Sequence, residues 1–221
     1  MADQDPGQDS LFREINEELR QEKFGKLWKT YGNYAIAVVV LAIAGVAGYQ
    51  VWHNRDLSKR AEESAQFTTA LRATMENRSA EATQTFTKLA ETGGDGYALI
   101  SKFDLAAIKS RDGNKAEAAS AYLAIASNKD TTPELRDLAL LLSVLQEIDN
   151  GDPKTLTDRI APLVSSANPW RFNAKEFTAY LAQRMGEMQR AGQLFRELAD
   201  DATAPQGIRT RAAEMSAVLG S

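Results

Sequence analysis

Hydrophobic residues are distributed along this chain in two contrasting ways. Between Thr30 and Asn54 the sequence carries no charged side chain, taking His53 as neutral, and its central part, residues 34–52, is almost wholly apolar. From about residue 80 onward, apolar residues instead recur every three or four positions among polar ones. The first pattern predicts a membrane-spanning helix, and the second predicts amphipathic helices that each bury one face.

The apolar run has the length and the borders of a transmembrane helix. Its 19 residues would span roughly 28 Å, close to the thickness of the hydrocarbon core of a bilayer. Tyr34 marks one border, and Tyr49 and Trp52 mark the other, as is typical of membrane–water interfaces. A buried core helix and a cleaved signal peptide are the alternatives. The 33 preceding residues hold seven acids, unlike the short basic start of a signal peptide, which favours an uncleaved signal anchor.

The charges that flank the run bear on its orientation. Four basic residues precede it and three follow it: Arg20, Lys23, Lys26 and Lys29, then Arg55, Lys59 and Arg60. The positive-inside rule therefore favours a cytoplasmic N-terminus only slightly. A long C-terminal domain can be translocated largely regardless of its charge, so that orientation stays open on these grounds.

Three later segments, residues 81–90, 117–126 and 190–199, align without gaps. Each has an Ala, an aromatic residue four positions on and Leu or Ile three positions after that: Ala82/Phe86/Leu89, Ala118/Tyr122/Ile125 and Ala191/Phe195/Leu198. A degenerate copy is Leu156/Ile160/Leu163. The copies start at 82, 118, 156 and 191, in steps of 36, 38 and 35 residues. A period near 34 with this spacing is typical of tetratricopeptide repeats. A generic Ala-rich helical bundle is the alternative, and the near-constant step favours the repeats.

Partner helices are predicted between these segments, near residues 96–111, 133–149 and 169–186, with a closing helix near 206–219. No break signal separates Trp52 from about Arg78, so we expect the membrane helix to continue through residues 55–76 as the first helix of the array. The predicted fold is therefore all-α, a single transmembrane helix followed by a tetratricopeptide-like solenoid of helical hairpins. Its predicted parts are an N-terminal tail (1–33) with an amphipathic helix, the transmembrane helix (34–52) and the repeat domain (53–221). For the tail, a simple polar extension of the membrane helix is the alternative.

Composition narrows the function. The formal net charge is −4, and residues 55–221 hold 21 basic and 23 acidic residues, so no basic face favours nucleic acid as a partner. The absence of cysteine excludes a thiolate nucleophile, a disulfide framework and a cysteine-ligated metal site. No phosphate loop, nucleophile elbow or dinucleotide fingerprint occurs. The sequence therefore predicts no catalytic, cofactor-binding or metal site.

A partner-binding groove is predicted on the concave face of the array. In stacked helical hairpins the first helix of each pair lines that face. Counting back from the aligned alanines places Ile100, Phe103, Leu141 and Tyr180 there, with the register near Leu141 open by one residue. The alternative is that these residues close the core, or that the long first helix folds back over them.

The segment before the span suggests a family. Residues 10–34 combine an apolar stripe with Phe12-Arg13-Glu14, Glu17-Glu18 and Leu27-Trp28. Followed by a single span and divergent repeats, this segment resembles the tetratricopeptide-like family of ancillary Sec translocon subunits in Gram-negative bacteria. The resemblance implies an inner-membrane protein with a cytoplasmic N-terminus and a periplasmic C-terminal domain. It also implies association with the protein-conducting channel and with a membrane-anchored periplasmic chaperone of the prolyl-isomerase-like class.

Three functional hypotheses follow. The first is a non-enzymatic, membrane-anchored scaffold or chaperone-like accessory of the Sec translocon, which binds periplasmic partners or unfolded secretory clients through its repeats. The second is a cell-envelope or division coordinator that recruits wall-synthesis enzymes through the same repeats. The third is an enzyme with an unusual site.

Overall fold

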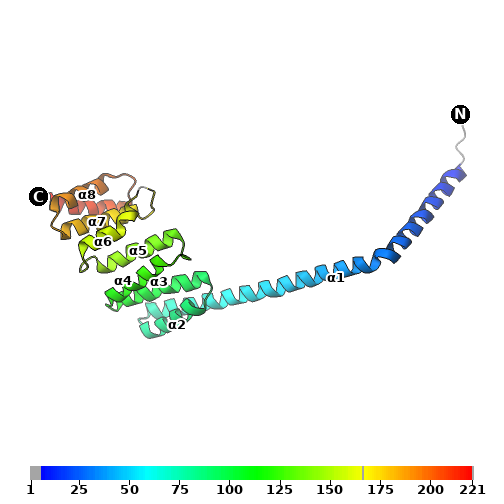
Figure 1. Ribbon diagram of the computed structural model, residues 1–221, viewed down its shortest axis with the longest axis horizontal. Helices are drawn as coiled ribbons and strands as arrows, with labels where there is room; N and C mark the ends of the chain where they lie inside the picture. Colours follow the sequence, from blue (N-terminus) through cyan, green and yellow to red (C-terminus); the bar gives the residue numbers. More distant parts are fainter. Residues whose placement is uncertain (1–5, 166, 221) are drawn as a thin grey trace, which may run out of the picture. The chain divides into compact units, whose positions relative to one another are not determined.

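The computed structural model describes the backbone of residues 6–165 and 167–220, and side chains from Trp28 onward within those ranges except Ala35. The described part is helical throughout and contains no strand, which confirms the predicted all-α class (Figure 1). Its helices are α1 (Pro6–Met75), α2 (Ser79–Thr92), α3 (Asp95–Arg111), α4 (Lys115–Ser127), α5 (Pro133–Glu147), α6 (Pro153–Ile160), the 3₁₀ helix η1 (Ala161–Val164), α7 (Arg171–Arg184), α8 (Met188–Asp200) and α9 (Gln206–Leu219). The chain forms two compact units, Met1–Lys59 and Arg60–Ser221.

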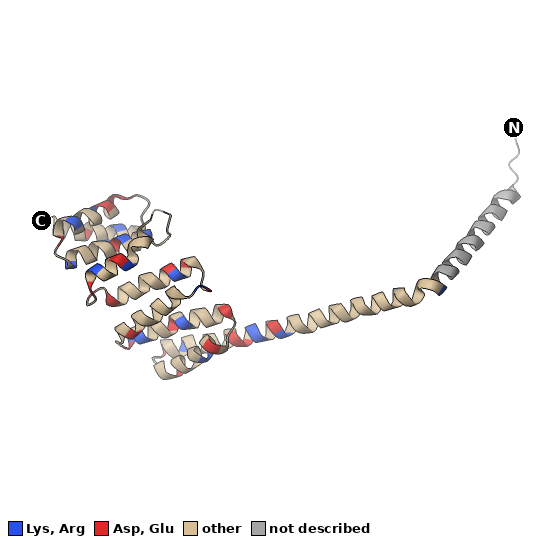
Figure 2. Ribbon diagram, viewed as in Figure 1, with Lys and Arg blue, Asp and Glu red and all other residues tan. Residues whose placement is uncertain are grey.

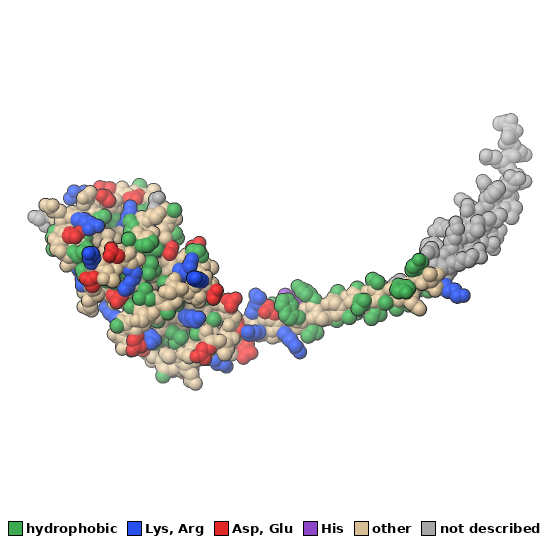
Figure 3. All heavy atoms as spheres, in the orientation of Figure 1, with side chains coloured by type: hydrophobic (Ala, Val, Ile, Leu, Met, Phe, Trp, Pro, Cys, Tyr) green, Lys and Arg blue, Asp and Glu red, His purple; other side chains and the backbone are tan. Residues whose placement is uncertain are grey.

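The first unit contains the apolar run as part of α1. The stretch Trp28–Met75 holds a window long and apolar enough to cross a membrane, and none of that window is buried against protein. No Lys, Arg, Asp or Glu lies between Lys29 and Arg55 (Figure 2), and apolar side chains stand exposed along this part of α1 (Figure 3). The part of the predicted amphipathic stripe before Trp28 lies outside the residues whose side chains are described.

The second unit begins with the last turns of α1. Ala70 and Ala73 are fully buried in one cluster with Ala82 and Phe86 of α2, and the ring of Phe67 meets that of Phe86 edge-on at 5.5 Å between centroids. The helix that contains the apolar run therefore continues into the array as its first helix, as the sequence predicts.

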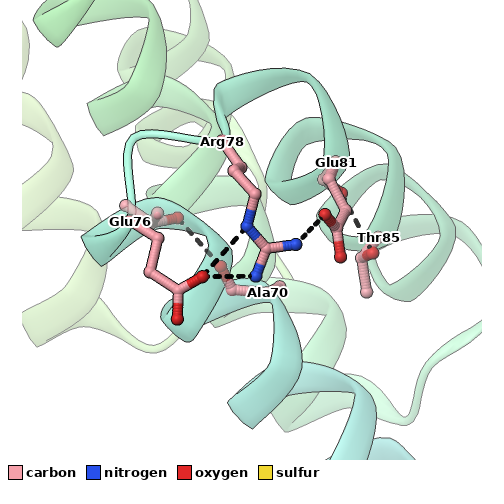
Figure 4. A network of polar contacts seen from close by, with 6 residues as sticks. Ala70, Glu76, Arg78, Glu81 and Thr85 are labelled. Carbon is pink, nitrogen blue, oxygen red and sulfur yellow. Dashed lines mark hydrogen bonds and ion pairs between the residues drawn. The ribbon is translucent and has the colours of Figure 1, made fainter.

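A polar contact closes this first hairpin at its turn. Arg78 donates to Glu76 Oε2 through Nη2 at 2.7 Å, and also pairs with Glu81 in the first turn of α2 (Figure 4). The negative charge of Glu81 also lies at the N-terminus of α2, where the helix dipole favours it. Side chains on both sides of the turn thus fix the chain's reversal between α1 and α2.

The repeat triplets form the core of the array. All twelve residues of the three aligned copies and the degenerate copy are buried, none more than 4 % exposed. They lie on α2, α4, α6–η1 and α8, the second helices of four successive hairpins. The helical-repeat arrangement expected from the sequence is confirmed.

A second periodic position lies on the first helix of each hairpin. Ala70, Ala106, Ser143 and Ala179 are each 0 % exposed, and they follow one another at steps of 36, 37 and 36 residues. A small side chain at this position lets the two helices of a hairpin approach closely, because no bulky group separates their backbones. The Ser143 hydroxyl donates to the carbonyl of Leu140 at 2.7 Å, so this polar group is satisfied inside the core.

Three of the four hairpins reverse direction through the same turn. Asn77, Gly113 and Gly186 adopt the left-handed conformation, with φ of 58°, 85° and 78°. In each case the next residue's N–H donates to a carbonyl five positions earlier, as in a Schellman motif: Arg78 to Ala73 at 2.8 Å, Asn114 to Lys109 at 2.9 Å and Glu187 to Ala182 at 3.0 Å.

We expect Gly113→Ala to lower the free energy of unfolding by about 1–2 kcal/mol, because an L side chain is strained in the left-handed region. A Cβ at Gly113 would meet no heavy atom within 4 Å, so the strain is confined to the backbone. Gly96→Ala is the matched control, since Gly96 lies in α3 with equally open space and alanine is favoured in helices. Denaturant unfolding of the full chain in detergent measures both changes. Equal midpoints for Gly113→Ala and the wild type would contradict this account.

The third hairpin departs from the pattern in its second helix. α6 has only eight residues, begins where the Asp152 carboxylate accepts the Thr155 N–H at 2.8 Å, and ends at Ile160. Pro162 follows within the 3₁₀ helix η1, and a proline can neither donate the next helical hydrogen bond nor avoid a clash with the preceding turn. The hairpin thus keeps its three buried apolar residues with a shorter second helix.

Candidate functional site

Two of the predicted groove residues lie on α3 in the second hairpin. Ile100 is 38 % exposed, whereas Phe103 is half-buried, with its ring centroid 6.0 Å from that of Tyr122 on α4. Phe103 therefore contributes one side of its ring to the core and leaves part of it at the surface. This pair offers an apolar contact area on a helix whose backbone is held by its neighbours.

The other two predicted groove residues lie in different hairpins. Leu141 is only 4 % exposed and packs in a core cluster with Leu163 and Ala174. The structure thus places Leu141 in the core, as the alternative interpretation holds for this position. Tyr180 is half-buried, with its ring edge-on to Phe195 at 5.0 Å between centroids. Phe103, Leu141 and Tyr180 thus pack in three different core clusters along the array.

Burial changes the pKa of two ionisable groups beside Phe103. Partial burial raises the pKa of the Asp104 carboxyl, while the positive charge of Arg111 lowers it. Burial also raises the pKa of the Tyr122 hydroxyl, and the charge of Asp104 raises it further. A partner that binds beside Phe103 would therefore lie near the Asp104 carboxylate, whose charged form is already poorly solvated.

A cleft that the sequence reasoning missed lies along α3 and α4. It consists of two adjoining hollows of about 390 and 320 Å³, which share Leu99, Lys102, Asn128 and Thr131. The first also contains Asp95 and Asp130 in its lining, and the second is lined by Leu105, Lys109, Ala121, Ala124 and Ile125. Leu99, Lys102, Leu105 and Lys109 recur at helical spacing, which is the only sequence signal that could have indicated this face.

One buried carboxylate of the array forms a structural ion pair. The Glu176 carboxylate is buried and accepts hydrogen bonds from Nε and Nη2 of Arg211 at 2.7 and 2.8 Å, which raises the pKa of Arg211. This pair joins α7 to α9. Among the described residues no group of three or more His, Cys, Asp or Glu side chains could hold a metal ion.

The aromatic residues predicted to border the membrane-spanning segment are exposed. Tyr34, Tyr49 and Trp52 are all exposed on α1. Tyr49 stacks on His53 with ring centroids 5.9 Å apart and lies 6.2 Å from Trp52. Three rings with polar atoms thus gather at one end of the uncharged run, where an aromatic belt requires amphipathic side chains.

Comparison with protein families gives one match, to the tetratricopeptide repeat-like domain, over residues 26–154. Comparison with curated proteins and with solved structures found no match. The matched region begins before the apolar run and extends through α5 to the start of α6, so it covers that run together with the first hairpins. Domains of this kind are typically non-catalytic modules for protein–protein interaction. Because the match covers 129 of 221 residues, the chain belongs to the tetratricopeptide repeat-like domain family.

Proposed function

We propose that this protein is a membrane-anchored scaffold or chaperone-like accessory subunit of the Sec translocon. The observation that carries the proposal is the composition of α1: an uncharged, exposed run suited to a bilayer is followed in the same helix by turns that are buried in the repeat array. A protein-interaction domain of this family is thereby tied covalently to a membrane segment. Residues 10–34, which resemble the pre-membrane segment of the ancillary translocon subunits, support the translocon in particular.

The proposed topology is a cytoplasmic N-terminus and a periplasmic repeat domain at the bacterial inner membrane. The exposed apolar side chains of α1 support the span, because a water-exposed apolar strip of this length is unfavourable. The family resemblance supports the orientation, since the flanking charges favour it only slightly. The proposed partners are the protein-conducting channel, a periplasmic prolyl-isomerase-like membrane chaperone and unfolded secretory clients.

The face of α3 that carries Ile100 and Phe103 is the proposed contact surface, with Tyr180 as a further position on α7. Apolar atoms exposed on a rigid helix are suited to bind an apolar segment of a partner, because burying them in a complex removes them from water. Leu141 has no part in this surface, because it is buried. The function needs no catalytic group, which agrees with the interaction role typical of the family.

We expect photo-crosslinkers at Ile100, Phe103 and Tyr180 to capture envelope proteins in cells, because these side chains reach the surface beside the core. A crosslinker at Lys88, which is exposed on α2, is the control and should capture far less. Mass spectrometry of the products separates the candidates: channel subunits and the prolyl-isomerase-like chaperone support the proposal, and wall-synthesis enzymes support a division coordinator. Equal products from Lys88, or crosslinks only within the chain, would exclude this surface.

A further inference from the structure

The α3–α4 cleft faces a different direction from the surface proposed above. Each residue of a helix advances by about 100° around the axis, so Lys109 lies on the side of α3 opposite Ile100. Leu99, at the edge of the cleft, lies only about 40° from Phe103 around the same axis, so the two surfaces adjoin on α3 but have different centres. The cleft extends along α3 from Asp95 to Lys109, a rise of about 21 Å that matches roughly four turns of a second helix.

The floor of the cleft is apolar and partly open. Leu99 and Leu105 are half-buried and Ala124 is exposed, while Ile125 is buried beneath them. The small side chains of Ala121 and Ala124 on α4 leave room for another helix to approach. Apolar side chains of an occupant would be removed from water here, which is the main source of affinity in helix-in-groove binding.

Charges along the cleft are arranged with one sign at each end. Asp95 and Asp130 line the first hollow, whereas Lys109 lines the second and Lys102 lines both. Lys109 Nζ is already paired with Glu117 Oε2 at 2.6 Å, an interaction that lowers the pKa of Glu117. Lys102 is exposed and makes no hydrogen bond or ion pair within the described part of the chain.

We propose that this cleft binds an amphipathic helix of a partner protein, with an apolar stripe on Leu99 and Leu105 and a carboxylate against Lys102. A basic residue two turns away on that helix would lie near Asp95 and Asp130. The charges of the cleft favour such a helix, because carboxylates at one end and an unpaired ammonium at the middle attract charges of the opposite layout. This inference goes beyond the proposed function, because it uses another face and needs no translocon.

The test uses the full chain in nanodiscs of zwitterionic lipid and two synthetic, fluorescent amphipathic helices. Both peptides carry the same leucine stripe and one terminal arginine; the first has glutamates and the second has lysines at the remaining flanking positions. Fluorescence anisotropy should show tighter binding of the glutamate peptide. Lys102→Glu replaces an attraction by a repulsion at an exposed position, so it should weaken binding of the glutamate peptide about tenfold and strengthen binding of the lysine peptide.

Two further variants make the result decisive. Lys88→Glu makes the same charge change on α2, outside the cleft, and should leave both affinities unchanged. Ala124→Trp fills the cleft from an exposed position and should abolish binding of both peptides while circular dichroism stays unchanged. Equal affinities for the two peptides, equal effects of Lys102→Glu and Lys88→Glu, or binding to empty nanodiscs alone would overturn the proposal.

A second copy of the chain is the competing occupant. Self-association of the chain that Ala124→Trp abolishes, without binding of either peptide, would show that the cleft is an interface between copies and would also overturn the proposal. Crosslinking from Phe103 should be unaffected by Lys102→Glu, so failure of this inference is distinguishable from failure of the proposed function.

Discussion

Replacing Phe195 by alanine should destabilise the repeat domain by about 3–5 kcal/mol, the usual cost of truncating a buried phenylalanine. Phe195 is fully buried on α8, contacts the Tyr180 ring edge-on and belongs to the cluster that joins α7, α8 and α9. Removing its ring leaves a cavity among α7, α8 and α9, whose lining loses its packing contacts. Helicity measured against temperature should show the loss.

The control for this variant is Met188→Ala in the first turn of the same helix. Met188 is about half exposed, and substitutions at such positions usually change stability by no more than about 0.5 kcal/mol. A Phe195→Ala variant that unfolds at the wild-type temperature would show that the third aligned triplet does not hold its hairpin together.

Replacing Val40 by arginine should prevent stable membrane insertion of α1. Val40 is exposed near the centre of the uncharged run, and a charge at the middle of a transmembrane helix costs about 2.5–3.5 kcal/mol on insertion scales. That cost corresponds to a change of about 100-fold in the insertion equilibrium. Alkaline extraction of membranes should release the variant and retain the wild type.

Asn54→Arg provides the matched control. Asn54 lies at the end of the uncharged run, next to Arg55, where an arginine side chain can reach the headgroups. This variant should remain in the membrane. Extraction of the wild-type chain by alkali would contradict the assignment of residues 34–52 as a span.

The features that the sequence predicted well depend on short-range spacing. Ala82, Phe86 and Leu89 lie on one stripe of a single helix, so their burial follows from helical geometry, and the recurrence of that stripe identified the second helices. The small residues of the first helices were missed, because Ser143 interrupts the alanine pattern and no aromatic residue marks their position. Their common step became visible only once the buried residues were known.

Contacts between hairpins could not be predicted in the same way. Arg184 donates to the carbonyl of Ile148 at 2.8 Å and so satisfies the end of α5 from the next repeat. The ion pair between Glu176 and Arg211 joins α7 to α9 through two residues that are 35 positions apart in the sequence. Nothing in a single sequence distinguishes these arginines from others on solvated faces.

Leu141 shows the limit of counting along a repeat. Several neighbours on α5 are also apolar, among them Leu140 and Leu142, so periodicity alone could not decide which residue faces outward. The packed structure places Leu141 inward and leaves its two neighbours half-buried. The α3–α4 cleft escaped prediction for a related reason, since its shape depends on how two helices meet rather than on either pattern.

The short second helix of the third hairpin has a consequence for how the array unfolds. In a solenoid each repeat is stabilised by its own packing and by its neighbours, so a repeat with a small interface couples the two sides weakly. α6 offers eight helical residues where α2, α4 and α8 offer 13 or 14. The domain should therefore behave as two cooperative blocks, one ending at α5 and the other starting at α7, with local opening between them before either block melts.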